Sequence, residues 1–205
     1  MRATLSALLL TAALATSAWA APLADLHGVH VGMQAAAMPA SDYRDFVCAD
    51  AKATRIGGWG DWKSCPAGAK GLRAMHVAFE TPGEDDTIVA GHPVVLTLAF
   101  DAEGRLARIV IETKAKTSLY MRKKAFLLAH QAKTHYGDAG WTCRSAKPSG
   151  DEEPIGHMFI KRDCSKTLKD RTVVVSSRLY HKAGGTPRDF VSKSRVTISW
   201  RGNPQ

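Results

Sequence analysis

Four cysteines in two local pairs constrain this chain more than any other feature of its sequence. Cys48 and Cys65 lie in the first half, and Cys143 and Cys164 lie in the second. Four cysteines allow three pairings, and we expect the local one because it places one bridge in each half. Each bridge would close a short loop and stabilise the fold by roughly 3 kcal/mol. A zinc site or a catalytic thiol is the alternative, but the sequence has no C-x-x-C motif.

The start of the chain indicates export. Met1 and Arg2 precede an uncharged, mostly apolar run that ends in Ala18-Trp19-Ala20, which predicts a signal peptide over residues 1–20. An uncleaved membrane anchor is the alternative, because the run is just long enough to span a bilayer. No later stretch is apolar enough to span a membrane. We therefore expect a periplasmic or secreted protein, in a compartment where cysteines oxidise.

The longest helix is expected within residues 117–143. Apolar side chains recur there at spacings of four, three, four and four residues, at Met121, Ala125, Leu128, Ala132 and Tyr136. This spacing places them on one face of a helix. Thr117 or Ser118 can cap the amino end, and Gly137 can adopt the left-handed conformation that closes the other end.

Six β-strands are expected, three in each half. Alternating or continuous apolar runs predict strands over residues 72–80, 94–100, 106–113, 157–164, 172–180 and 194–200. A short helix is expected over 33–38, and residues 43–49 fit a helix or a strand. The Gly- and Trp-rich segment 55–66 predicts a loop, in which Trp59 and Trp62 either pack over the local disulfide or form an exposed aromatic contact.

The order of these elements predicts an α+β fold. One helix followed by three strands occurs twice, over residues 21–116 and 117–205. Short turns between the strands favour antiparallel pairing. We therefore expect a tandem αβββ repeat with one disulfide per repeat. The two units would share one antiparallel sheet, with helices packed on one face, and form one compact domain.

Positive charge is concentrated in the second unit. Residues 117–205 contain 17 basic and 7 acidic residues, whereas residues 21–116 contain 10 and 12. A solvated face is one explanation; the other is an acidic partner, namely a protein surface, an anionic lipid headgroup or an envelope polymer, and not nucleic acid. The candidate binding residues are Arg122, Lys123, Lys124, Lys161, Arg162, Lys166, Arg171, Arg178 and Arg195.

Several short motifs resemble the β-lactamase inhibitor protein family and the small outer-membrane assembly lipoproteins of the SmpA/OmlA type. The segment Gly28-Val29-His30-Val31-Gly32-Met33, followed by one cysteine and then a second after a Gly-rich loop, is similar to the start of such domains. The resemblance implies a tandem repeat of helices and antiparallel strands with one disulfide per repeat. It also implies a protein partner. The lipoproteins' anchor cysteine is absent here.

The histidines do not suggest a metal or catalytic site. His130 and His135 are five apart on the expected helix, about 140° around it, and so do not converge on one ion. The sequence has no H-E-x-x-H, no G-x-S-x-G and no Gly-rich phosphate loop. We therefore expect a non-enzymatic, exported binding protein without a metal or cofactor. The alternative is a hydrolase that acts on an envelope polymer.

Overall fold

The fold is one large antiparallel sheet. The computed structural model describes residues 25–186 and 188–202, so the predicted signal peptide lies outside the described residues. This part of the chain forms ten strands in a single sheet: β1 (Tyr43–Cys48), β2 (Arg73–Phe79), β3 (Ile88–Val89), β4 (His92–Phe100), β5 (Leu106–Thr113), β6 (Thr142–Ser145), β7 (Glu152–Glu153), β8 (Ile160–Thr167), β9 (Arg171–Lys182) and β10 (Phe190–Trp200). With 45% strand and 15% helix, the fold is predominantly β, and the predicted α+β class is wrong.

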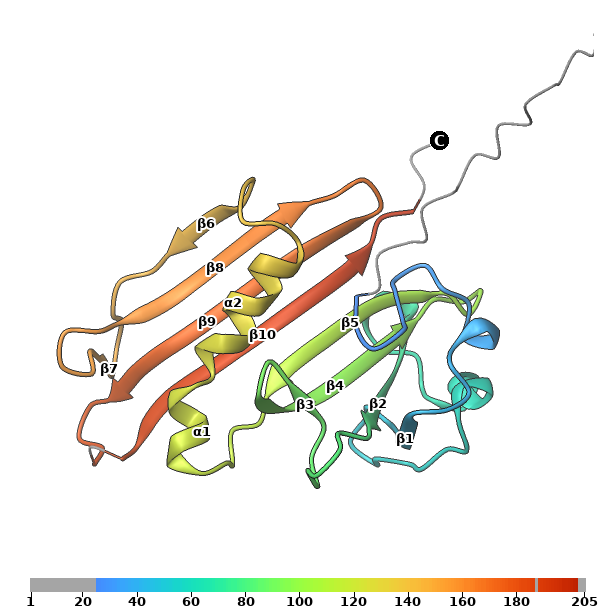
Figure 1. Cartoon of the computed structure of the whole chain (residues 1–205), viewed down its shortest axis with the longest axis horizontal. Coiled ribbons are helices and arrows are strands. Elements are labelled where there is room, and N and C mark those ends of the chain that lie inside the picture. Colours follow the sequence, from blue (N-terminus) through green and yellow to red (C-terminus); the bar gives the residue numbers. More distant parts are fainter. Residues whose placement is uncertain (1–24, 187, 203–205) are drawn as a thin grey trace, which may run out of the picture.

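The strand order joins the two halves of the chain. The order is β1-β2-β4-β5-β10-β9-β8-β6, with β3 paired to β4 and β7 to β9 (Figure 1). The junction is the β5–β10 pair, where Ile109 faces Ile198 and Ile111 faces Val196. All four side chains are buried. The two halves therefore share one core across this pair, as expected for a common antiparallel sheet.

The first half departs most from the prediction. Its helices are short 3₁₀ turns, η1 (Ala35–Ala37), η2 (Trp59–Ser64) and η3 (Ala69–Gly71), so no α-helix covers it within the described residues, and the tandem αβββ repeat is wrong. The segment around η1 is instead pinned to the β4–β5 turn. The amide of Gly32 donates to the Leu106 carbonyl, and that of Ala35 to the Gly104 carbonyl, both at 2.8 Å. These bonds use donors that an α-helix would need, and three alanines are too few to nucleate one.

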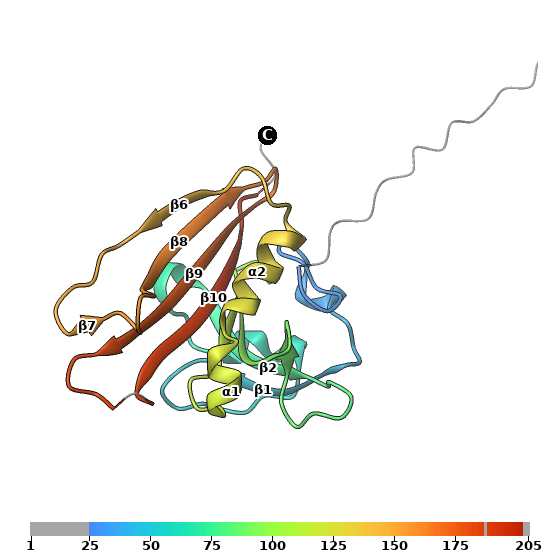
Figure 2. The ribbon, with the colours of Figure 1, turned by 60° about the vertical axis from the view of Figure 1, so that its left-hand side comes forward.

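The predicted long helix is divided in two. Ser118 caps α1 (Leu119–Lys123) by accepting from the Met121 amide at 3.3 Å. A tight turn follows, in which the Lys124 amide donates to the Met121 carbonyl at 3.0 Å. Next comes α2 (Phe126–His135), after which Gly137 adopts the expected positive φ of 83°. The helices lie along β10 (Figure 2). The predicted inner face is buried at Ala125, Leu128, Ala132 and Tyr136, and partly at Met121.

The predicted disulfides and both tryptophans belong to the framework. Bridges join Cys48 to Cys65 and Cys143 to Cys164, so the local pairing is confirmed and the zinc and thiol alternatives are wrong. Trp59 and Trp62 are buried, and their rings lie 6.5 and 6.0 Å from that of Phe100. They are therefore core residues and not an exposed aromatic contact.

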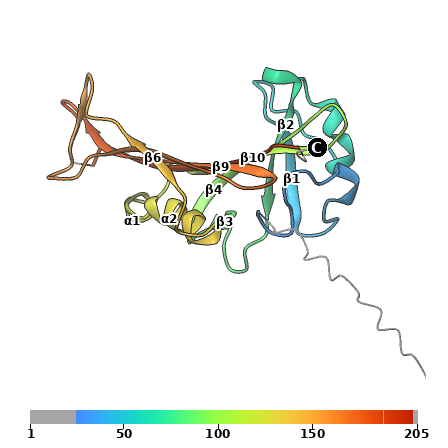
Figure 3. The ribbon, with the colours of Figure 1, turned by 90° about the horizontal axis from the view of Figure 1, so that it is seen from above.

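The second half of the sheet has two unlike faces. Figure 3 shows α1 and α2 on one side of β9 and β10, which we call the covered face. Side chains of Val173, Val175, Val196 and Ile198 are buried there. Lys161, Arg178 and Lys193 occupy alternate strand positions that point the other way, to what we call the open face. Of the described helices, none lies over the open face (Figure 3), and none is long and apolar enough to cross a bilayer.

Candidate functional site

A row of three cations crosses the open face. In the register of the sheet, Lys161 on β8 is directly opposite Arg178 on β9, and Arg178 is directly opposite Lys193 on β10. Like charges in directly opposed positions destabilise a sheet. Such a row therefore persists only if nearby groups compensate for it.

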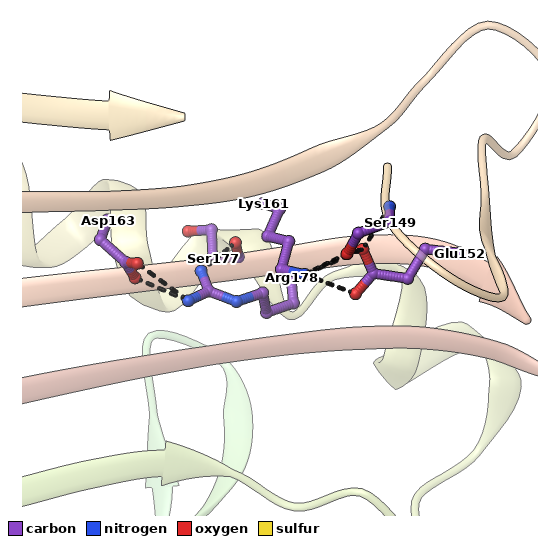
Figure 4. Close-up of polar contacts among 6 residues, drawn as sticks. All are labelled: Ser149, Glu152, Lys161, Asp163, Ser177 and Arg178. Carbon is purple, nitrogen blue, oxygen red and sulfur yellow. Dashed lines mark hydrogen bonds and ion pairs between the residues drawn. The ribbon is translucent and has the colours of Figure 1, made fainter. Parts of the chain in front are cut away.

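Carboxylates from neighbouring segments supply this compensation at two of the cations (Figure 4). Lys161 Nζ donates to the two carboxylate oxygens of Glu152 at 2.7 and 2.9 Å. The amide and hydroxyl of Ser149 hold the same carboxylate, at 3.2 and 3.1 Å. Arg178 forms a two-bond pair with Asp163, at 2.9 Å to each oxygen. Both cations are thus fixed in position by groups of the chain itself.

Positive charge is in excess at the β10 end of the row. Lys193 and Arg195 both form ion pairs with a single carboxylate, that of Glu112 on β5. Arg195 and Lys193 remain 50% and 41% exposed, whereas Glu112 is 22% exposed. Two accessible cations therefore share one largely covered carboxylate.

These residues frame a depression of about 250 Å³ in the open face. It is lined by Ser176, Arg178, Lys193 and Arg195. The lining thus combines three cationic side chains with one hydroxyl, and it contains no carboxylate. A planar guanidinium can grip a carboxylate or phosphate through two parallel hydrogen bonds. Both Nη atoms of Arg178 already donate to the chain, to the Arg162 and Ser177 carbonyls and to Asp163. An anionic group of a ligand would therefore contact mainly the more exposed cations, Lys193 and Arg195.

The supporting carboxylates stay ionised at neutral pH. Burial raises the pKa of Glu112, but hydrogen bonds from Lys193 and Arg195 outweigh it, so that its pKa lies below the usual value. For Asp163 as well, burial is outweighed by hydrogen bonds from Ser176 and Arg178, which lower its pKa. The Lys161 hydrogen bond lowers the pKa of Glu152. The cations thus remain paired across the neutral range.

Of the nine predicted binding residues, the structure brings together Lys161, Arg178 and Arg195. The prediction omits Lys193, Ser176 and Glu112, which strand alternation and register place beside them. Arg162 and Lys166 pair in register with Ser177 and Val173 and lie on the covered face.

The other predicted cations have structural contacts of their own. Lys166 Nζ donates to the Tyr136 and Gly137 carbonyls at 2.5 and 2.9 Å and so caps α2. Arg122 stacks on the Phe190 ring, 4.3 Å from its centroid. Lys124 lies 4.0 Å over the Tyr120 ring. Lys123 is exposed on α1.

Arg171 is buried, contrary to its predicted place in a binding patch. With Asp25 and Tyr136 it forms a cluster of buried polar side chains, here called the lock, which joins the first residues described to the second half of the chain. Arg171 pairs with Asp25, and the two side chains are 3% and 0% exposed. Asp25 also accepts from the Val31 amide at 2.8 Å and from the Tyr136 hydroxyl at 2.7 Å. Burial, followed by the Asp25 charge, raises the pKa of Tyr136. The ion pair and these hydrogen bonds compensate for the burial of the polar groups and so stabilise the fold.

The lock lies beside a second hollow, of about 340 Å³, between α2 and the covered face. Its lining is mostly apolar, with Leu26, Val89, Ile111, Leu128, Val196 and Ile198 among its residues. The histidines His27 and His135 also line it. Across residues 25–186 and 188–202, no three His, Cys, Asp or Glu side chains are grouped so that they could hold a metal ion.

Comparison with protein-family models, with curated proteins and with solved structures finds no match to this chain.

Proposed function

We propose that this chain is an exported, non-enzymatic binding protein that holds an acidic partner on its open face. The partner presents carboxylate or phosphate groups, either on an acidic protein surface or on an envelope polymer. One observation carries the proposal: three cations and a hydroxyl line the depression at Arg178, Lys193 and Arg195, with no carboxylate among them. The two disulfides support export, because such bridges persist in oxidising compartments.

The carboxylates behind the cations favour binding because they reduce its entropic penalty. A free lysine or arginine side chain loses about 0.5–1.5 kcal/mol of conformational entropy when a ligand immobilises it. Asp163 and Glu112 already restrict Arg178, Lys193 and Arg195. A ligand that approaches the depression therefore meets cationic side chains whose positions are already restricted.

The test is binding of poly-L-glutamate, a polymer that carries only carboxylates, to a charge-reduced variant. The variant combines Arg178→Gln, Lys193→Gln and Arg195→Gln. Its control removes the same charge from exposed lysines elsewhere, through Lys52→Gln, Lys116→Gln and Lys147→Gln. If each contact contributes roughly 1 kcal/mol, the site variant loses about a hundredfold in affinity and the control less than threefold.

Equal losses of affinity in the two variants would mean that binding depends only on the net charge of the protein, and would contradict the proposal. A shallow response of the affinity to salt would contradict it too, because exposed ion pairs are screened. The single variant Lys193→Gln tests whether a loss of affinity is caused by misfolding, because Arg195 still pairs with Glu112 in that variant. It is expected to lose affinity about fivefold while its circular dichroism spectrum is unchanged.

A further inference from the structure

Exposed apolar side chains are concentrated on the helical segment. Large hydrophobic residues are exposed at five described positions, and three of these lie within residues 119–126. Leu119 is 40%, Tyr120 63% and Phe126 56% exposed. The remaining two, Val95 and Met158, are far from them in the sequence. Most of the large apolar side chains exposed in the described residues therefore lie in one short segment.

These side chains lie in the first turns of the two helices. Leu119 and Tyr120 begin α1, and Phe126 begins α2 after the turn at Lys124. Ala125 and Leu128 of the same segment are buried. Figure 3 shows the same helices projecting from the covered side of the sheet, away from the open face. The surface is therefore separate from the candidate anion site.

Lysines accompany the apolar groups, and acidic residues do not. From residue 113 to residue 137 the sequence contains no Asp or Glu. Lys116 and Lys123 are exposed, and Lys124 Nζ lies 4.0 Å from the Tyr120 ring centroid. Within the described chain, no ion pair joins any of these three lysines to a carboxylate. Their charge is thus available to an external anion.

We infer that this outer surface, formed by Leu119, Tyr120, Phe126 and the lysines at 116, 123 and 124, docks on an anionic lipid bilayer. Surface segments bind anionic bilayers when apolar and aromatic side chains enter the headgroup boundary while lysines contact lipid phosphates. The apolar side chains here are interleaved with cations and do not form a continuous patch. That arrangement fits headgroups better than the apolar centre of a protein interface, where lysine is depleted.

Vesicle binding of the full chain tests the inference. The partition coefficient is measured by co-sedimentation with vesicles of phosphatidylcholine, with and without phosphatidylglycerol. Binding to the anionic vesicles alone is expected. Combining Lys116→Gln, Lys123→Gln and Lys124→Gln lowers the coefficient about a hundredfold, because each lysine near an anionic surface contributes a factor of about five. Combining Leu119→Ser, Tyr120→Ser and Phe126→Ser lowers it at least tenfold.

The controls distinguish binding through this surface from non-specific hydrophobic or electrostatic adsorption and from binding through the open face. Met158→Ser removes an equally exposed apolar group elsewhere, and Lys52→Gln with Lys147→Gln removes distant charge; each is expected to change the coefficient less than twofold. Equal binding to uncharged vesicles, or no binding to anionic ones, overturns the inference. So does loss of vesicle binding in the Arg178, Lys193 and Arg195 variant with retention in the Lys116, Lys123 and Lys124 variant. If the serine variant fails to fold, the glutamine variant still decides the matter.

Discussion

Asp25→Asn removes the negative charge from the buried lock while keeping the shape of the side chain. In the folded chain, Asp25 and Arg171 are 0% and 3% exposed. The substitution leaves Arg171 buried beside a neutral amide. Removal of one partner from a buried ion pair typically destabilises a protein by about 3–5 kcal/mol. Because Asp170 still pairs with Arg171, at 2.7 Å, we expect the lower end, about 3 kcal/mol.

Asp170→Asn is the matched control, since it removes the other carboxylate from the same arginine. Asp170 is 39% exposed, and solvent screens exposed pairs, so this change is expected to destabilise by less than about 1 kcal/mol. Urea unfolding followed by tryptophan fluorescence measures both. For a chain of this size, 3 kcal/mol corresponds to a shift of roughly 1.5 M in the midpoint. Equal midpoints for the two variants would refute the argument that burial decides the difference.

Two further predictions concern pH and one glycine. The pKa of Glu112 is lowered in the folded state. Its ion pairs therefore stabilise the fold at a pH above the usual glutamate pKa of about 4.5, and this stabilisation is lost as the pH falls through the lowered pKa. Glu112→Gln should make the unfolding free energy fall less steeply at acid pH, and an unchanged slope would contradict the assignment. Gly104 has a φ of 80°, and an added Cβ would lie 3.0 Å from the Trp62 ring. Gly104→Ala should therefore destabilise by at least about 1–2 kcal/mol and alter the near-ultraviolet circular dichroism of Trp62, whereas an unchanged melting temperature would argue against that contact.

Strand alternation was the most reliable guide in the sequence. The expected strand at 194–200 lies within β10, where the alternate residues Val196 and Ile198 are buried and Trp200 is partly buried. The same alternation could have divided the basic residues. Arg171 has the parity of the buried Val173 and Val175, and Arg162 and Lys166 have that of the bridged Cys164, which leaves Lys161 and Asp163 on the other face. A count of charges ignores whether a residue is at an odd or even strand position, and therefore assigns basic residues from both faces of the sheet to one site.

The replacement of the expected α-helix in the first half by short 3₁₀ turns could not be predicted from the local sequence pattern. The amides around Ala35 donate to carbonyls of the β4–β5 turn, some seventy residues away in the sequence, so the contact that prevents an α-helix is invisible in the segment itself. The Glu112 contacts are similarly distant, because they depend on β5 pairing with β10. The resemblance to the β-lactamase inhibitor protein family, the signal peptide and the hydrolase alternative all stay predictions.

The β5–β10 pair joins strands that are far apart in the sequence. The first five strands precede α1, but the neighbour that covers β5 follows all the other described strands. Without that neighbour β5 presents unpaired backbone groups, and such an edge invites association with other chains. A product truncated before residue 190 should therefore aggregate through β5, and a chaperone that shields that edge until β10 pairs with it would raise the yield of native protein.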